Sequence, residues 1–185
     1  FWKFNRKKGK IITENSFSVE LPPYAQDLSD SGKKISAGWV FTNSFNSERY
    51  IGGFGPGNTK FRDRLPNEAG MSAKDTDYLH MIHLDTAKKL FKEGKFTKIN
   101  GHAVISMKTM VENNALFLIP EPKSPHGVMI DPTGQYLTVS GKLDTHVSVY
   151  DFKKMKKLID SKTYEGRDPY NIPILSMTES LHGQV

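Results

Sequence analysis

The chain has no cysteine among its 185 residues. A disulfide scaffold, a thiolate nucleophile, an iron–sulfur cluster and a thiolate-bound metal are therefore excluded within these residues. Any metal must be held by histidine, carboxylate, carbonyl or methionine groups. Long apolar runs are also missing: the longest candidate, Ala115–Ile119, is far shorter than the roughly 20 residues of a membrane helix, so we expect no membrane span.

Positive charge is in excess, with a formal net charge of +6, but it is concentrated in two local runs rather than spread along the chain. The first run is Arg6–Lys10, and the second is Lys153–Lys157. The second lies on a predicted helix, Asp151–Asp160, whose apolar residues keep helical spacing and leave the lysines on the opposite face. No recognised nucleic-acid motif accompanies either run, so we expect solvated faces and no nucleic-acid partner.

The hydrophobic fraction of 37% and the charged fraction of 25% are typical of a globular protein with one core. The sequence starts at Phe1, carries no signal peptide and stops at Val185 without a polar tail. We expect it to be an internal fragment of a longer protein.

Short strands separated by turn residues are the main local pattern. Predicted strands cover Trp2–Phe4, Phe17–Leu21, Gly38–Ser44, Tyr78–Leu84 and Leu116–Ile119, followed by Val128–Ile130, Tyr136–Val139 and Val147–Phe152. Asp131-Pro132-Thr133-Gly134 suits a type I turn between antiparallel strands. The region after Pro125 is therefore predicted to be a β-meander.

A weak internal repeat links two parts of the chain. Gly38–Phe41 and Tyr78–Asp85 resemble Gln135–Thr138 and Val147–Asp151, and each copy ends in Lys-Lys-Leu on a short helix. Repeated meanders of roughly 40 to 50 residues are typical of β-propeller blades. The first copy carries a long polar insertion, Glu48–Asp77, and such insertions are often functional.

The six histidines differ in their potential as ligands; they are His80, His83, His102, His126, His146 and His182. His80 and His83 should point to opposite faces of a strand, and His102 and His146 should be surface residues. His126 and His182 are each followed by glycine where a loop enters a strand, so adjacent blades could bring them to one central site. Imidazole alone suits copper, zinc, iron or nickel.

Three motifs carry a resemblance to a known family: Pro120–Gly127, Asp131-Pro132-x-Gly134-x-Tyr136 and Ser140–Leu143. They resemble the propeller domain of nitrous-oxide reductases, most closely the branch exported through the general secretory route. Asn46-Ser47-Glu48, Met71, Asp77 and Leu181-His182 follow in the family's order.

The resemblance implies an all-β fold: a partial seven-bladed β-propeller of about three blades, with short helices after strands. Residues 1–185 would be a fragment of the N-terminal propeller domain, and the C-terminal cupredoxin domain would not be present. It further implies a four-copper sulfide cluster, with His126 and His182 as two of its seven imidazole ligands. The calcium ion of the family would be bound by Phe45, Glu48, Met71, Asp77 and Ser124, with Phe45 and Met71 using backbone carbonyls.

The implied activity is the reduction of nitrous oxide to dinitrogen and water, with electrons from a cytochrome or a cupredoxin. The family also implies a homodimer, a periplasmic or extracytoplasmic location and a dinuclear copper centre in the cupredoxin domain. This fragment would be inactive alone. Lys142 could supply a cation near the cluster or be an exposed turn residue. The alternative is a metal-free propeller that serves as a binding or scaffold domain.

Overall fold

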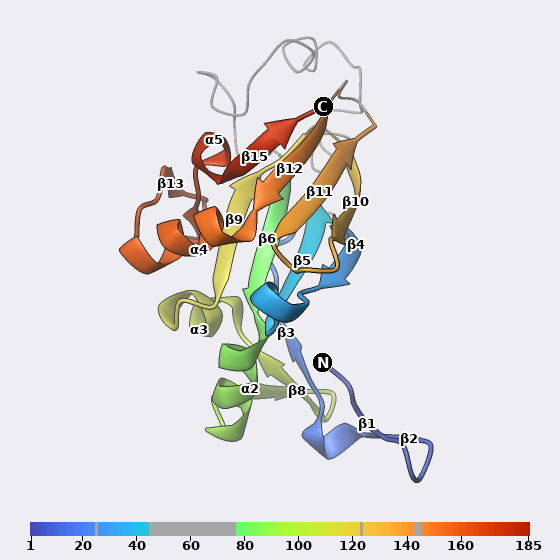
Figure 1. The fold of residues 1–185 in the computed structure, drawn as a ribbon. Helices are drawn as coiled ribbons and strands as arrows, with labels where there is room; N and C mark the ends of the chain where they lie inside the picture. Colours follow the sequence, from blue (N-terminus) through green and yellow to red (C-terminus); the bar gives the residue numbers. More distant parts are fainter. Residues whose placement is uncertain (25, 45–76, 123, 143–145) are drawn as a thin grey trace.

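Strands dominate the computed structural model, which describes residues 1–24, 26–44, 77–122, 124–142 and 146–185. The largest sheet has six strands in the order β13-β14-β9-β6-β5-β4 (Figure 1). Its members are β4 (Gln26–Ser31), β5 (Trp39–Ser44), β6 (Tyr78–His83), β9 (Leu116–Pro120), β13 (Gly166–Arg167) and β14 (Pro173–Ile174). The run β4-β5-β6-β9 is antiparallel throughout and follows the order of the chain.

A second sheet repeats this arrangement with four antiparallel strands in the order β10-β11-β12-β15. They are β10 (Pro125–Ile130), β11 (Tyr136–Gly141), β12 (Val147–Asp151) and β15 (Leu181–Gln184). This is the meander predicted after Pro125, and the two sheets correspond to the two copies of the internal repeat.

Two small sheets complete the strands: β1 (Lys3–Asn5) with β2 (Lys10–Ile12), and β3 (Phe17–Val19) with β8 (His102–Ile105) and β7 (Thr97–Ile99). The pairs β3–β8 and β14–β9 are parallel, which the alternation of side chains did not predict. They join segments far apart in the sequence.

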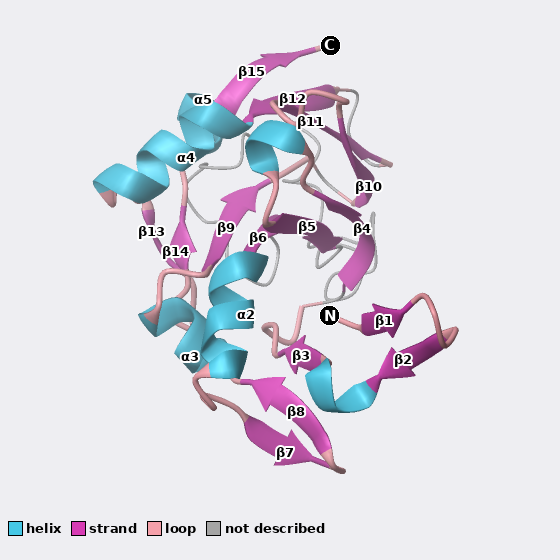
Figure 2. Ribbon diagram, turned by 60° about the horizontal axis from the view of Figure 1, so that its bottom comes forward, coloured by secondary structure: helices cyan, strands magenta, loops and turns pink. Residues whose placement is uncertain are grey.

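Short helices connect the strands, as Figure 2 shows. They are α2 (Leu84–Lys92), α3 (Met107–Glu112), α4 (Phe152–Ser161) and α5 (Met177–Ser180), with 3-10 turns η1 (Thr13–Asn15) and η2 (Lys34–Ser36). Asp151 caps α4 by accepting the Lys153 N–H at 2.8 Å. The buried face of α4 carries Phe152, Met155, Leu158 and Ile159, which confirms the helical spacing predicted there.

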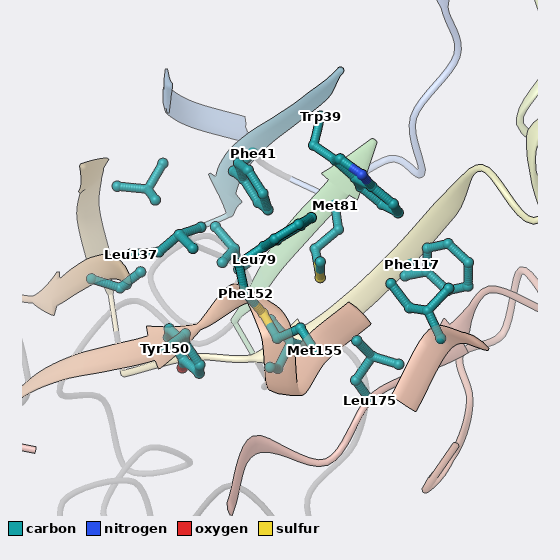
Figure 3. Close-up of a cluster of buried hydrophobic side chains, with 14 of the residues drawn as sticks. Trp39, Phe41, Leu79, Met81, Phe117, Leu137, Tyr150, Phe152, Met155 and Leu175 are labelled. Atoms are coloured by element: carbon teal, nitrogen blue, oxygen red, sulfur yellow. The ribbon is translucent and has the colours of Figure 1, made fainter. Parts of the chain in front are cut away.

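The main core lies between the two large sheets. In Figure 3, Phe41 of β5 and Leu79 and Met81 of β6 gather with Leu137 of β11 and Tyr150 of β12. Phe152 and Met155 of α4 enter the same cluster, and Phe41 meets the Phe152 ring edge-on at 6.1 Å. A second cluster lies between the other face of the six-stranded sheet and the α2, α3 and β8 region.

The expectation of a mostly β protein with few, short helices is confirmed. Within the part of the chain described, no helix is long and apolar enough to cross a membrane.

Candidate metal centre

Two strands from different sheets, β4 and β10, lie side by side and bring Asp27 and His126 together (Figure 1). Both strands are irregular at this point. In β4, Asp27 and Leu28 together oppose the single residue Asn43, and in β10, His126 and Gly127 together oppose Ser140. Such β-bulges bend a strand and re-aim its side chains, and they are frequent near active sites. The same irregularity thus occurs at equivalent places in both copies of the repeat.

Gly127 allows the bulge in β10 to form. Its φ of +124° is a backbone conformation that residues with a side chain rarely adopt. The neighbouring His126 is consequently turned away from the core, and its side chain is 60% exposed. The sequence Pro-His-Gly therefore places an imidazole outward at the beginning of a strand whose Val128 and Ile130 point into the core.

Asp27 fixes the orientation of the His126 ring. Its Oδ2 lies 2.9 Å from His126 Nδ1, and its side chain is only 20% exposed. Because a carboxylate can only accept, Nδ1 carries the hydrogen, and Nε2 of the neutral ring keeps its lone pair. A histidine whose Nδ1–H donates to a carboxylate while Nε2 stays open is the arrangement of a metal-bound imidazole with its supporting acid.

A second link between β4 and β10 lies a few residues further along. Asp30 Oδ2 accepts the Ile130 N–H at 3.0 Å, and Lys33 Nζ donates to the Ile130 carbonyl at 2.9 Å. Partial burial of Asp30 opposes its ionisation, but the hydrogen bonds from Ile130, Ser31 and Lys33 outweigh it and lower the pKa of its carboxyl. The two strands are thus linked both at the bulges, through Asp27 and His126, and beyond them, through Ile130.

His182 is not brought near His126. It lies on β15, at the opposite edge of the four-stranded sheet, and its ring packs against Tyr136 with 4.7 Å between centroids. Three strand spacings of about 4.8 Å separate the two edges, which amounts to about 14 Å. The register also sets His182 level with Met129 and Ile130 rather than with His126. The two imidazoles therefore do not converge within this structure.

Of the other four histidines, His80, His83 and His146 lie where they were expected, whereas His102, expected at the surface, is only partly exposed. His80 is fully buried and His83, partly exposed, stacks on Trp39, so the two point to opposite faces of β6. Burial lowers the pKa of His80 to about 4, more than its hydrogen bonds raise it. His102 stacks on Trp2 and pairs with Ser18, and His146 is exposed just before β12.

Two of the expected calcium ligands, Asp77 and Ser124, are in contact. The Ser124 N–H donates to Asp77 Oδ2 at 2.6 Å, and both residues are buried. The Ser124 carbonyl in turn accepts the N–H of Lys142, an exposed residue at the end of the meander's second strand, at 2.8 Å. Phe45, Glu48 and Met71 lie outside the described residues, as does nearly all of the predicted insertion.

Glu121 is a buried acid beside Asp77 that the sequence did not single out. Its N–H donates to the Asp77 carbonyl, and its carboxylate accepts from the Asn43 amide at 2.6 Å and from the Ser44 N–H at 3.2 Å. Burial, and then the charge of Asp77, raise the pKa of Glu121 well above its usual range. A charged residue directly after the fully apolar strand Leu116–Pro120 was the available signal.

The described residues do not by themselves complete a metal site, because none of their histidines, aspartates and glutamates form groups of three or more suited to an ion. They contain one oriented imidazole, that of His126 with Asp27. They also contain a buried pair of acids, Asp77 and Glu121. Asn43 lies between the imidazole and this pair, since it opposes the Asp27 bulge and donates to Glu121.

These features define a mostly β protein in which two similar antiparallel sheets meet at an oriented histidine. No family model matches the chain. Over an alignment of 103 residues that covers 54% of the chain, the sequence is 26% identical to the nitrous-oxide reductase of Pseudomonas fluorescens. The match covers 16% of that relative's length, so the similarity is distant and partial.

Proposed function

We propose that this chain is part of the β-propeller domain of a copper-dependent nitrous-oxide reductase and that His126 is one of its copper ligands. The observation that carries the proposal is the Asp27–His126 pair, in which Asp27 holds Nδ1 of an imidazole whose side chain is 60% exposed where the two repeated sheets meet. The distant similarity to the Pseudomonas fluorescens nitrous-oxide reductase supports the same assignment.

The strand order supports the propeller. In β4-β5-β6-β9 and in β10-β11-β12-β15, four strands follow one another antiparallel, and the first strands of the two units are neighbours. Adjacent blades of a propeller are expected to be arranged in this way around a channel. The small sheets would belong to a third blade, giving about three of seven, and residues 1–185 would be a fragment of the domain.

Copper fits the chemistry of His126, but the described residues supply too few ligands for a cluster. An imidazole with a carboxylate behind it is a good copper ligand. The remaining imidazoles of a four-copper sulfide cluster would come from other parts of the polypeptide. The strand positions give no support to His182 as a second ligand, and that role stays a prediction.

When bound, the cluster would supply the electrons that break the N–O bond of nitrous oxide, which takes up two electrons and two protons to give dinitrogen and water. The chain's own contribution would be to orient His126 through Asp27 and to keep its Nδ1 protonated. The donor of electrons would be a cytochrome or a cupredoxin, and the dinuclear copper centre would lie in a separate cupredoxin domain.

Calcium would be held on the other side of Asn43. Asp77 supplies a buried carboxylate, and Ser124 lies against it, with its N–H donating to Asp77 Oδ2 at 2.6 Å. Glu121 is a second buried acid beside Asp77, and a hard cation would offset the repulsion between the two carboxylates. Phe45, Glu48 and Met71 complete the proposed ligand set. A homodimer outside the cytoplasm is part of the same proposal.

The test is made in a complete nitrous-oxide reductase polypeptide that contains this chain. His126→Ala should remove most cluster copper and abolish nitrous-oxide reduction, and Asp27→Asn should reduce copper content without unfolding the protein. His182→Ala tests the predicted ligand role of that residue, whose strand is at the opposite edge of the sheet. The matched control is His146→Ala, a change at an exposed histidine just before β12, which should keep its copper. Full copper loading and activity in His126→Ala would reject the proposal, and loss of copper in His182→Ala would restore His182 as a ligand.

A second candidate is a metal-free propeller that binds a partner or serves as a scaffold. One observation favours it: the described residues contain no group of three or more histidines or acids that could hold a metal ion. It predicts that the parent polypeptide binds no copper and that His126→Ala leaves its metal content unchanged. Elemental analysis of the purified parent distinguishes the two candidates.

A further inference from the structure

An open groove lies between η2 and α4, away from the Asp27–His126 pair. Its volume is about 780 Å³, within the usual range for binding sites. The groove is close to the turn after β10, because the Ile35 N–H of η2 donates to the Thr133 carbonyl of that turn. His126 is at the beginning of β10, so groove and histidine lie at opposite ends of that strand.

The floor of the groove is apolar. It is formed by Ile35, Ala37, Trp39 and Phe152, of which Ile35 is 46% exposed. An isoleucine with so much exposed surface is held there by rigid surroundings: Ser36 is fully buried, and Lys34 adopts a φ of +40°, which non-glycine residues rarely do. The groove therefore presents a fixed apolar contact point.

One wall of the groove is cationic. Lys153, Lys156 and Lys157 project from one side of α4 and line it, together with the single acid Asp160. Asp160 pairs with Lys156. Among the residues whose positions are described, Lys153 and Lys157 form no salt bridge, and like charges four residues apart destabilise a helix by a few tenths of a kcal/mol. An anionic partner would remove this repulsion.

We propose that this groove binds an extended acidic segment of a partner protein, with an apolar side chain of that segment packed on Ile35. The wall supplies two unneutralised ammonium groups for carboxylates, and the floor supplies the apolar contact. The open shape suits a peptide that stays partly in solvent rather than a small molecule that needs enclosure. The groove is separate from the proposed copper site and does not depend on it.

The probe is a rhodamine-labelled peptide of sequence Glu-Asp-Leu-Glu-Glu, titrated with the 185-residue chain and followed by fluorescence anisotropy. We expect saturable binding that weakens as salt is added. Lys153→Glu/Lys157→Glu should weaken it by about tenfold or more. Ile35→Ser should weaken binding of this peptide but not of a peptide with serine in place of leucine.

The matched control is Lys89→Glu/Lys92→Glu on α2, which makes the same change of charge on the other lysine-rich helix, outside the groove. It should change the affinity by less than about twofold. Circular dichroism confirms that each variant is folded. The proposal would be overturned if both double variants weakened binding equally or if the leucine and serine peptides bound equally well. Binding that does not saturate would also overturn it, as would tighter binding of a DNA duplex at the same groove.

Discussion

At the scale of single residues, His80 couples folding to pH. Its fully buried ring has a pKa of about 4, below the value of about 6.5 in an unfolded chain. As pH falls, the unfolded chain takes up this proton first. The contribution of neutral His80 is therefore present in full above about pH 6.5 and is lost as pH falls toward 4.

We expect the wild-type chain to lose about 3 kcal/mol relative to His80→Gln between pH 7 and pH 4, because the variant cannot bind that proton. Urea unfolding of both proteins at pH 7 and at intervals down to pH 4 gives the difference. Parallel stability curves for the two proteins would show that protonation of His80 does not contribute.

Residues near the candidate site were partly predictable. His126 was found because Pro-His-Gly before a strand is visible locally, and Asp77 and Ser124 followed from the family resemblance. Asp27 was missed because it lies 99 residues from His126 and meets it only when β4 and β10 come together. Glu121 was missed because its significance depends on burial and on contacts with Asn43 and Ser44, which lie 78 and 77 residues away in the chain.

At the scale of elements, the turn after β10 packs closely against the backbone just before η2. Gly134 in the turn after β10 has a φ of +77°, and a side-chain carbon added there would lie 1.7 Å from the Lys33 carbonyl oxygen, which belongs to the chain just before η2. A side chain at this position would therefore require the backbone of one of the two segments to shift.

Gly134→Ala should therefore destabilise the chain by about 3 kcal/mol or more, through strain and displacement of the backbone. Gly94→Ala is the control: it has a similar φ of +73° but open space around it, and should cost only about 1 kcal/mol. Chemical denaturation measures both. An equal loss of unfolding free energy in the two variants would mean that the turn at Gly134 can accommodate a side chain without a large shift of the backbone.

Elements with local signals were predicted well. The expected strand Tyr78–Leu84 is observed as Tyr78–His83, and the expected helix Asp151–Asp160 as Phe152–Ser161. β4 was not predicted, since its sequence Gln-Asp-Leu-Ser-Asp-Ser is polar and its bulge breaks the alternation. The parallel pairs β3–β8 and β14–β9 depend on packing between distant segments, which leaves no trace in local periodicity.

At the scale of the whole molecule, the outer surface of β4 and β10 carries apolar side chains that the chain leaves open. Leu28 is 53% exposed and Met129 is 72% exposed, and Leu28 lies close to Gly127 in the bulge of β10. Exposed apolar surface beside strand edges promotes association. In the proposed propeller this surface would face the channel.

The isolated chain should therefore self-associate, and Leu28→Lys/Met129→Lys should weaken that association by about tenfold, with little change in thermal stability. Val147→Lys, a change on a less exposed apolar residue of β12, is the control and should leave association nearly unchanged. Sedimentation velocity over a range of concentrations measures both. If the double variant associated as strongly as the wild-type chain, the surface responsible for self-association would not be the one that carries Leu28 and Met129.

The 99-residue separation between Asp27 and His126 also has a kinetic consequence. Closing so long a loop is slow compared with forming a hairpin or a helical turn, so this pair arises only after both sheets have docked. During synthesis the imidazole would stay unoriented until the second sheet is finished. A chain arrested before that stage would offer no aligned nitrogen, so the proposed metal could bind only late in maturation.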